Sequence, residues 1–109
     1  MCGITGIFNI SGKPVSINAL RRMTDTIAHR GPDGEGFWSN EYIGLGHRRL
    51  AIIDLSPLGH QPMQTDDGNF IITYNGEVYN FMNIRIELES LGYKFHSRTD
   101  SEVILKSYQ

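Results

Sequence analysis

The sequence predicts a small α+β domain with many tight turns. Its 109 residues are enough for one such domain, which would span residues 1–109. Twelve glycines, several of them in short clusters with Asp or Asn, indicate frequent turns of the kind that connect short strands. Three other stretches repeat apolar residues at helical spacing. We therefore expect a strand-rich unit that also contains three helices.

The first half of the chain is expected to place one helix among four strands. Ser16 is a suitable N-cap for the helix, and Gly31-Pro32 should end it. The apolar stripe of this helix consists of Ile17, Leu20, Met23 and Ile27. The expected strands are residues 3–10, 37–38, 42–45 and 47–54. A turn at Ser39-Asn40-Glu41 would join the second strand to the third as a hairpin.

The second half is expected to contain two strands and two helices. The expected strands are residues 69–74 and 93–98. Asn80 can cap a helix that ends near Gly92, and Thr99 opens the last helix with capping-box spacing. The stripe of the first of these helices consists of Phe81, Ile84, Leu88 and Leu91, with Arg85 and Glu89 as an i,i+4 pair. The last helical pattern continues to Gln109, so we expect the natural protein to continue beyond this residue.

Composition argues against several classes of function. The formal net charge of −2 and the pI near 6.0 give no basic patch for nucleic acid. No apolar run approaches the roughly 18–20 residues of a membrane span, and the N-terminus lacks the profile of a secretory signal. A single cysteine cannot form an internal disulfide. We therefore expect a cytoplasmic protein with neither nucleic acid nor membrane as a partner.

Cofactor and metal motifs are not evident in the sequence either. The four histidines, at positions 29, 47, 60 and 96, lack metal-ligand spacing. Neither of the glycine-rich phosphate-binding motifs occurs, and no basic residue follows the glycines of residues 31–36. We expect this segment to bind no metal and no cofactor.

The only cysteine, Cys2, is a candidate nucleophile. A second residue as small as cysteine allows the initiator Met1 to be removed, and Cys2 would then carry both a thiol and a free α-amine. Near neutral pH a useful fraction of an α-amine is the free base, which can activate a nucleophile on the same residue. The alternative is that Cys2 is a small buried hydrophobic residue at the start of a strand.

The adjacent arginines Arg48 and Arg49 are candidates for binding a carboxylate. An arginine can clamp a carboxylate through two parallel hydrogen bonds. Adjacent strand residues point to opposite faces, so at most one of the two arginines should enter a given pocket. A surface ion pair is the alternative role for either side chain.

Asn75-Gly76 supports two interpretations. Asn-Gly is the strongest short signal for a two-residue hairpin turn. The alternative is an oxyanion hole, because the Asn side-chain amide and a neighbouring main-chain N–H both donate hydrogen bonds. The acidic residues Glu77 and Asp100 could hold an ammonium group. Alternatively, Glu77 is a solvated turn residue, and Asp100 is a carboxylate favoured by a helix N-terminus.

Six motifs occur in an order that resembles one protein family. They are MCGITG (residues 1–6), HRGPDG (29–34), HRRLAIID (47–54), QPM (61–63), YNGE (74–77) and RTDSE (98–102). Over essentially its whole length the chain resembles the N-terminal glutaminase domain of glutamine-hydrolysing asparagine synthetases, which are class II glutamine amidotransferases. The RGPDG wording is more similar to this branch than to the glucosamine-phosphate and phosphoribosylamine branches.

The resemblance implies a fold and a reaction. The fold is the four-layer αββα sandwich of N-terminal-nucleophile hydrolases, of which this chain would form only part. The reaction is hydrolysis of the glutamine side-chain amide to glutamate and ammonia, through a thioester on Cys2 with its own α-amine as general base. Asn75 and the Gly76 N–H would form the oxyanion hole.

The resemblance also implies how glutamine and a partner domain are bound. Arg49 would bind the α-carboxylate of glutamine, Asp100 and Glu77 its α-amino group, and the main chain at Ile52 and Ile53 would line the pocket. Members of the family pass ammonia to a C-terminal synthetase domain, absent from this sequence, which uses ATP and magnesium to make asparagine from aspartate. A homodimer is an oligomeric state that the family allows.

Two alternatives to this function stay open from the sequence. A non-catalytic fragment or interaction module would keep the motifs without the activity. A retained Met1 favours it, because the catalytic amine would then be part of an amide bond. The second alternative is an amidotransferase with a different nitrogen acceptor.

Overall fold

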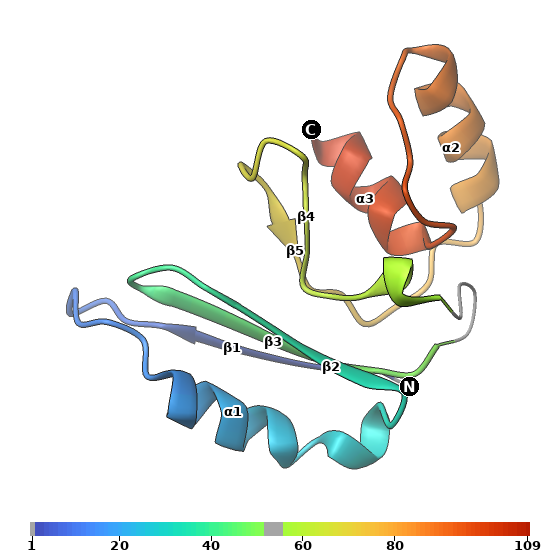
Figure 1. Ribbon diagram of the computed structural model, residues 1–109. Coiled ribbons are helices and arrows are strands. Elements are labelled where there is room, and N and C mark those ends of the chain that lie inside the picture. Colours follow the sequence, from blue (N-terminus) through green and yellow to red (C-terminus); the bar gives the residue numbers. More distant parts are fainter. Residues whose placement is uncertain (1, 52–55) are drawn as a thin grey trace.

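The computed structural model describes residues 2–51 and 56–109, whose elements lie on both sides of a three-stranded sheet (Figure 1). The first half contains β1 (Gly3–Phe8), α1 (Ile17–Asp25), the 3₁₀ turn η1 (Ala28–Arg30), β2 (Gly34–Ser39) and β3 (Ile43–Arg49). The second half contains the 3₁₀ turn η2 (Pro57–Gly59), β4 (Met63–Gln64), β5 (Ile71–Ile72), α2 (Phe81–Ser90) and α3 (Asp100–Tyr108). The fold is a small mixed domain of helices and strands, as the sequence predicts.

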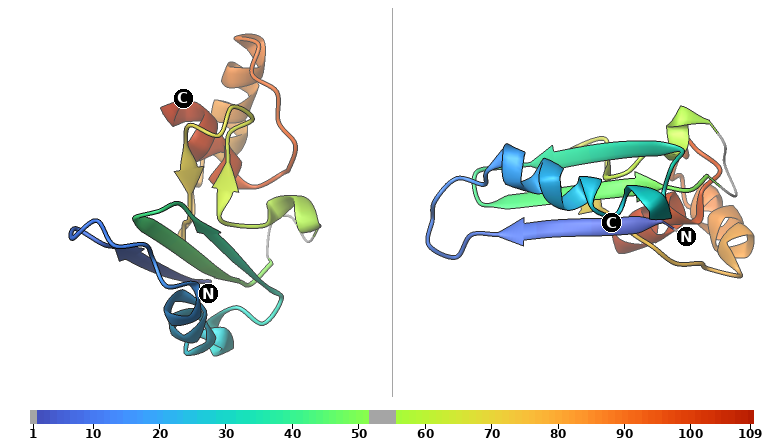
Figure 2. Two further views of the ribbon diagram at one scale, coloured as in Figure 1. Left: turned by 60° about the vertical axis from the view of Figure 1, so that its left-hand side comes forward. Right: turned by 90° about the horizontal axis from the view of Figure 1, so that it is seen from below.

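The main sheet is antiparallel, with strand order β1-β3-β2. One face of this sheet is covered by α1, and the two-stranded β4-β5 sheet with α2 and α3 lies on the other side (Figures 1 and 2). The central strand β3 carries His47, which lies opposite Ile4 of β1 and Gly36 of β2. Opposite residues in an antiparallel pair point to the same face. His47 and Arg49 therefore share one face of β3, while Arg48 points to the other.

Helix α1 is capped at its start and packs on the sheet through Leu20 and Thr24, while Ile17 and Met23 of the predicted stripe are exposed. The Ser16 hydroxyl accepts a hydrogen bond from the Ala19 N–H at 3.2 Å, which confirms the predicted N-cap. Leu20 and Thr24 are completely buried against the sheet. A side chain at Gly46 would collide with Thr5 and Thr24, so glycine in β3 is what allows the helix to pack this closely.

The α1 helix ends at Asp25, two residues before the predicted last member of its stripe, Ile27. The Thr26 hydroxyl donates to the Met23 carbonyl at 2.6 Å, and the Ile27 N–H donates to the Thr24 carbonyl at 3₁₀ spacing. Such local side-chain bonds compete with the regular helical pattern. The chain then continues as η1 and Gly31 follows that turn, so the prediction that Gly31-Pro32 ends the helix is wrong.

The predicted hairpin of the main sheet is confirmed, but its second strand is longer than predicted. The Asn40 side chain accepts hydrogen bonds from the N–H groups of Tyr42 (3.0 Å) and Ile43 (2.8 Å), which closes the turn. The predicted separate strand 47–54 is wrong in its boundaries. β3 runs through Gly46 without a break and ends at Arg49. Ile52 to Asp54 lie outside the described residues.

The two strands predicted in the second half are the largest errors of the sequence analysis. Of residues 69–74 only Ile71–Ile72 pair as a strand, with Met63 and Gln64. Residues 93–98 form no strand, because the Glu102 carboxylate takes the N–H groups of His96 (2.9 Å) and Ser97 (2.7 Å). Main-chain donors held by a side chain are not available to a neighbouring strand.

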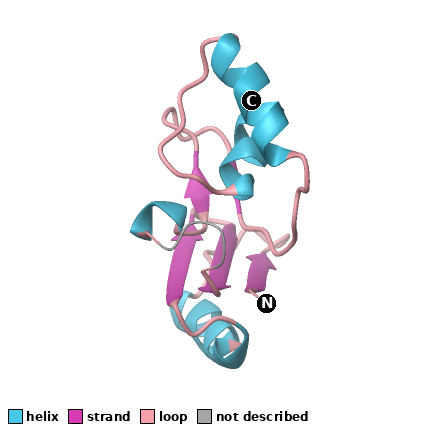
Figure 3. Ribbon diagram, turned by 90° about the vertical axis from the view of Figure 1, so that its right-hand side faces the viewer, coloured by secondary structure: helices cyan, strands magenta, loops and turns pink. Residues whose placement is uncertain are grey.

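The predicted helices α2 and α3 are both present and contact each other (Figure 3). Helix α2 begins after Asn80 as expected, although the Asn80 side chain makes no capping bond. The predicted Arg85–Glu89 pair is formed at 3.3 Å. In α3 the Thr99 hydroxyl accepts from the Glu102 N–H at 3.3 Å, which is half of the predicted capping box. The other half is missing because Glu102 binds His96 and Ser97 instead.

Candidate active site

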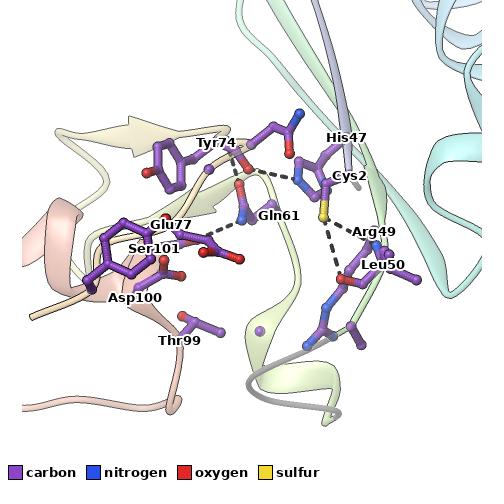
Figure 4. A pocket seen from close by; sticks show the side chains of 15 residues that line it. Cys2, His47, Arg49, Leu50, Gln61, Tyr74, Glu77, Thr99, Asp100 and Ser101 are labelled. Atoms are coloured by element: carbon purple, nitrogen blue, oxygen red, sulfur yellow. Dashed lines mark hydrogen bonds between the residues drawn. The ribbon is translucent and has the colours of Figure 1, made fainter. Parts of the chain in front are cut away.

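A cavity of about 410 Å³ lies between the end of β3 and the start of α3 (Figure 4). Its walls come from the chain before β1, from β3 and η2, from the segment after β5 and from the first turn of α3. Six of the eight predicted site residues line it: Cys2, Arg49, Asn75, Gly76, Glu77 and Asp100. The other two, Ile52 and Ile53, lie outside the described residues. The structure thus brings residues from four distant segments to one cavity.

Cys2 reaches the cavity because Gly3, the next residue, pairs with Arg48 near the end of β3. The Cys2 Sγ lies 3.3 Å from the Leu50 nitrogen, whose N–H donates to it, and 3.5 Å from the Leu50 carbonyl oxygen. The Cys2 carbonyl accepts a hydrogen bond from Arg30 Nε at 3.2 Å. The side chain is half-buried. Both its sulfur and its main chain are therefore held in place at the cavity wall.

The two adjacent arginines have separate roles, as their alternation along the strand requires. Arg48 forms an ion pair with Glu35 at 2.7 Å and donates to the Gly31 carbonyl at 3.2 Å. Arg49 lines the cavity, where its Nη1 donates to the Ser56 carbonyl at 2.6 Å. The surface ion-pair interpretation therefore fits Arg48, and Arg49 is the arginine that lines the cavity.

Asn75-Gly76 is not the turn of a hairpin. No strand of the described chain follows it, and the next element is α2. A Cβ at Gly76 would lie 2.5 Å from the Tyr74 hydroxyl and 2.7 Å from the Tyr74 Cζ, so the main chain passes directly against this ring. Both residues lie along the cavity wall. An Asn side-chain amide and a main-chain N–H are both hydrogen-bond donors.

The acidic residues Glu77 and Asp100 give the cavity a negative region. Asp100 is buried in the first turn of α3, where its Oδ2 accepts from the Val78 N–H at 3.0 Å. Burial raises the pKa of the Tyr74 hydroxyl, and the charges of Asp100 and Glu77 raise it further. Figure 4 shows these two carboxylates across the open space from Arg49. A cavity with a guanidinium and two carboxylates is suited to a zwitterion such as a free amino acid.

Three buried polar residues of the cavity wall were not predicted from the sequence: His47, Gln61 and Ser101. Gln61 Oε1 accepts from the Tyr74 N–H at 2.7 Å, and Gln61 Nε2 lies 2.9 Å from Ser101 Oγ. His47 Nε2 lies 3.2 Å from the Tyr74 carbonyl oxygen. For His47 a signal was available, because alternation along β3 puts it on the face of Arg49. Gln61 opens the QPM motif, but the sequence offered no physical reason to assign this loop residue a role in the site.

The protonation state of His47 follows from its surroundings. A carbonyl oxygen only accepts, so Nε2 carries the proton that it donates to Tyr74. The other ring nitrogen, Nδ1, is buried and has no partner among the described residues. Burial lowers the pKa of His47 by more than the hydrogen bond to Tyr74 raises it, and electrostatic repulsion from His60 and Arg49 lowers it further. His47 is therefore neutral near pH 7.

The described residues also bear on two other classes of site. Within residues 2–51 and 56–109, no group of three or more His, Cys, Asp or Glu side chains is arranged to hold a metal ion. No helix in this part of the chain has both the length and the apolar character that crossing a membrane requires.

Comparison with known proteins places the chain in a family. The family described as "glutamine amidotransferase domain" matches residues 1–109. The chain is 41% identical to asparagine synthetase [glutamine-hydrolyzing] 1 of Bacillus subtilis, with 100% of this chain and 18% of the relative covered. For asparagine synthetase B [glutamine-hydrolyzing] of Escherichia coli the identity is 34%, with 100% of this chain and 20% of the relative covered. For the protein named Amidase chry2 of Gibberella zeae the identity is 36%, with 100% of this chain and 18% of the relative covered.

The extent of these matches decides what they establish. The chain spans about a fifth of the length of each of these relatives, and the family match covers all of its own residues. The relatives named as asparagine synthetases are also named as glutamine-hydrolysing. The chain belongs to the glutamine amidotransferase domain family.

Proposed function

We propose that this chain hydrolyses the side-chain amide of glutamine to glutamate and ammonia, with Cys2 as the nucleophile. The observation that carries the proposal is the single cavity in which Cys2, a guanidinium and two carboxylates meet. A cavity of about 410 Å³ has the size of a small-molecule site. The family supports glutamine as the amide donor.

Arg49, Glu77 and Asp100 are proposed to orient the amino-acid end of glutamine. The Arg49 guanidinium binds the α-carboxylate, and the two carboxylates bind the α-ammonium group. The main chain at Ile52 and Ile53 is proposed to complete the pocket. These contacts hold the side-chain amide of glutamine beside the Cys2 sulfur, which converts an encounter in solution into a reaction between positioned groups.

The first chemical step is proposed to form a thioester. The Cys2 sulfur attacks the amide carbon while the α-amine of Cys2 takes the thiol proton. The resulting oxyanion accepts hydrogen bonds from the Asn75 side-chain amide and the Gly76 N–H. The intermediate collapses, the C–N bond breaks, and the protonated α-amine gives its proton to the leaving ammonia.

The second step is proposed to regenerate the enzyme with water. The oxygen of a water molecule attacks the thioester carbon while the α-amine takes a proton from that water. The Asn75 side-chain amide and the Gly76 N–H again donate to the oxyanion. The C–S bond then breaks, glutamate leaves and the sulfur regains the proton. This cycle requires that Met1 be removed, because only then is the amine of Cys2 free.

In longer proteins of the family the ammonia is proposed to serve ATP-dependent synthesis of asparagine from aspartate. ATP and magnesium are assigned to the synthetase domain, and no step of glutamine hydrolysis here uses them. The more specific fold that we propose for this mixed domain is the αββα sandwich of N-terminal-nucleophile hydrolases. Its support is the order α1, main sheet, β4-β5 sheet and helices α2 and α3 (Figure 1).

The test combines intact mass with glutamate release from glutamine. We expect the mass to show loss of Met1, and we expect Cys2→Ala to release no glutamate. Cys2→Ser should lose at least about 100-fold in kcat, because a hydroxyl is a poorer nucleophile when its base is a weak amine. If Met1 is absent and Cys2→Ala still releases glutamate at the native rate, the proposed mechanism is wrong.

A further inference from the structure

Tyr74, which immediately precedes the proposed oxyanion donors, is held by two side chains instead of by a neighbouring strand. Its N–H donates to Gln61 Oε1 at 2.7 Å, and its carbonyl accepts from His47 Nε2 at 3.2 Å. The paired strand β5 ends two residues earlier, at Ile72. Both main-chain polar groups of Tyr74 are thus satisfied by side chains of the cavity wall (Figure 4).

These two side chains belong to the buried framework of the domain. His47 is 1% exposed in the central strand of the main sheet, and Gln61 is 7% exposed. The amide of Gln61 also donates to Ser101 Oγ at 2.9 Å in the first turn of α3. The chain of bonds from His47 through Tyr74 and Gln61 to Ser101 therefore joins the strand that carries Arg49 to the helix that carries Asp100.

The chemistry of His47 fits a holding role and not proton transfer. Its Nε2–H is committed to the Tyr74 carbonyl. Its Nδ1 is enclosed by protein and lacks a partner among the described residues. A proton added to Nδ1 would place a buried charge with no acceptor, which is costly.

We propose that Gln61 and His47 are positioning residues, a clamp on Tyr74 that fixes where the Asn75 amide and the Gly76 N–H point. The catalytic part of this inference rests on the proposed function. Oxyanion donors are effective only when their positions are fixed before the reaction. Asn75 and Gly76 lack a strand partner of their own in the described chain, so the clamp on the preceding residue is what fixes their approach to the cavity.

The kinetic test is Gln61→Met, which keeps the size of the side chain but removes the acceptor for the Tyr74 N–H. We expect kcat for glutamine to fall about 10- to 100-fold, as for a displaced catalytic group, while KM changes less than about threefold. Cys2 should react with iodoacetamide at the native rate, because the bonds of its sulfur to Leu50 do not involve Gln61. The matched control is Gln64→Met, the same change at an exposed residue of β4.

A second measurement does not depend on activity. Amide hydrogen exchange at Tyr74 should accelerate in Gln61→Met and remain native in Gln64→Met, because only Gln61 accepts from the Tyr74 N–H. Ser101→Ala removes only the hydrogen bond that Gln61 donates to Ser101. It should accelerate exchange at Tyr74 and lower kcat to a smaller degree than Gln61→Met. It provides the answer if Gln61→Met does not fold.

The outcomes separate the clamp from the proposed function. Unchanged exchange at Tyr74 in both Gln61→Met and Ser101→Ala overturns the clamp, whatever the activity. Accelerated exchange with native kcat shows that the clamp does not position the donors, and overturns the catalytic part. A native protein with Met1 removed that releases no glutamate overturns the proposed function, and the exchange result still decides the clamp.

Discussion

At the residue scale, the neighbours Arg48 and Arg49 show how strand alternation assigns different roles to identical side chains. Arg48 is paired with Glu35 on the outer face of β3, and Arg49 extends into the cavity. Their chemistry is the same, so their environments alone decide which of them can meet a substrate. Each arginine is consequently the natural control for the other.

Arg49→Lys is expected to raise the KM for glutamine at least about tenfold with a smaller effect on kcat. Lysine keeps the charge but cannot offer the two parallel N–H groups that match a carboxylate. Arg48→Lys should leave the KM unchanged, because Arg48 serves an ion pair outside the cavity. Steady-state kinetics with glutamine decide the matter, and equal effects of the two substitutions would remove Arg49 from the substrate site.

His47 is expected to make stability depend on pH. In the folded chain, burial lowers the pKa of His47 below the ordinary value of 6.5. At a pH between this lowered pKa and 6.5, the unfolded chain therefore binds a proton that the folded chain does not. The free energy of unfolding should therefore fall as the pH drops below 6.5, by up to about 1.4 kcal/mol per pH unit, and stay level above it.

Urea unfolding at pH 5, 6 and 7 measures this dependence. His47→Gln, which keeps an N–H donor but does not titrate, should reduce the slope between pH 5 and 6.5. His96→Gln is the control, because the His96 imidazole is exposed and lies 3.1 Å from the exposed carboxylate of Asp66. A slope that survives in His47→Gln and disappears in His96→Gln would show that another histidine carries the effect.

At the element scale, side chains that bind main-chain groups explain where prediction from sequence succeeded and where it failed. The caps at Ser16 and Thr99 act within one turn, so their residues were visible in the sequence. The hairpin at Asn40 is equally local. The bonds of Glu102 to His96 and Ser97 look just as local, but the same residue also fits a capping box, and sequence cannot tell which set of donors it will take.

The short β5 strand illustrates a limit that is not local. Residues 69–74 carry a strong strand pattern, yet Tyr74 is held by His47, 27 residues away, and by Gln61, 13 residues away. Those contacts exist only once β3 and the start of α3 are folded. The same contacts place Asn75-Gly76 in the cavity wall, so the choice between a hairpin turn and a cavity segment could not be made from the two residues themselves.

The start of α3 is expected to depend on Glu102 for stability. Its carboxylate is 3% exposed and accepts from the His96 N–H, the Ser97 N–H and the Ser97 hydroxyl. Glu102→Ala leaves these buried donors unpaired and should cost about 2–4 kcal/mol of the free energy of unfolding. The matched change Glu89→Ala removes only the exposed pair with Arg85 and should cost less than about 0.5 kcal/mol.

Denaturant unfolding of the two variants side by side measures this difference. Glu102→Gln should recover part of the loss, because an amide oxygen still accepts from the main chain. If Glu102→Ala and Glu89→Ala cost the same, the hydrogen bonds of Glu102 contribute nothing beyond a surface carboxylate.

At the scale of the whole molecule, the order of six motifs predicted the family, and the structure adds how they meet. Residues near positions 2, 49, 75 and 100 converge because β1 pairs with β3 and α3 packs beyond the cavity. The fold is only partly closed. Its radius of gyration of 14.5 Å exceeds the roughly 13 Å typical of a compact domain of about 100 residues. Large apolar side chains such as Phe8 (69% exposed) and Ile10 (90%) remain in contact with solvent.

This incomplete burial predicts where the stability of the 109-residue chain resides. Among the described residues the buried large apolar side chains are Leu20, Val103 and Leu105, and Leu91 is 69% exposed although it belongs to the predicted stripe of α2. Leu20→Ala removes fully buried methyl groups between α1 and the sheet and should cost about 2–5 kcal/mol. Leu91→Ala makes the same chemical change at an exposed site and should cost less than about 0.5 kcal/mol.

A native free energy of unfolding below about 5 kcal/mol is expected, because a chain this small that leaves apolar faces exposed lies at the low end of domain stability. On that scale Leu20→Ala should leave the chain largely unfolded at 25 °C, whereas Leu91→Ala should give the native urea midpoint. Circular dichroism of both variants across a urea series distinguishes them. A cost at Leu91 equal to that at Leu20 would mean that α2 buries its stripe in solution, which would contradict the partly open fold.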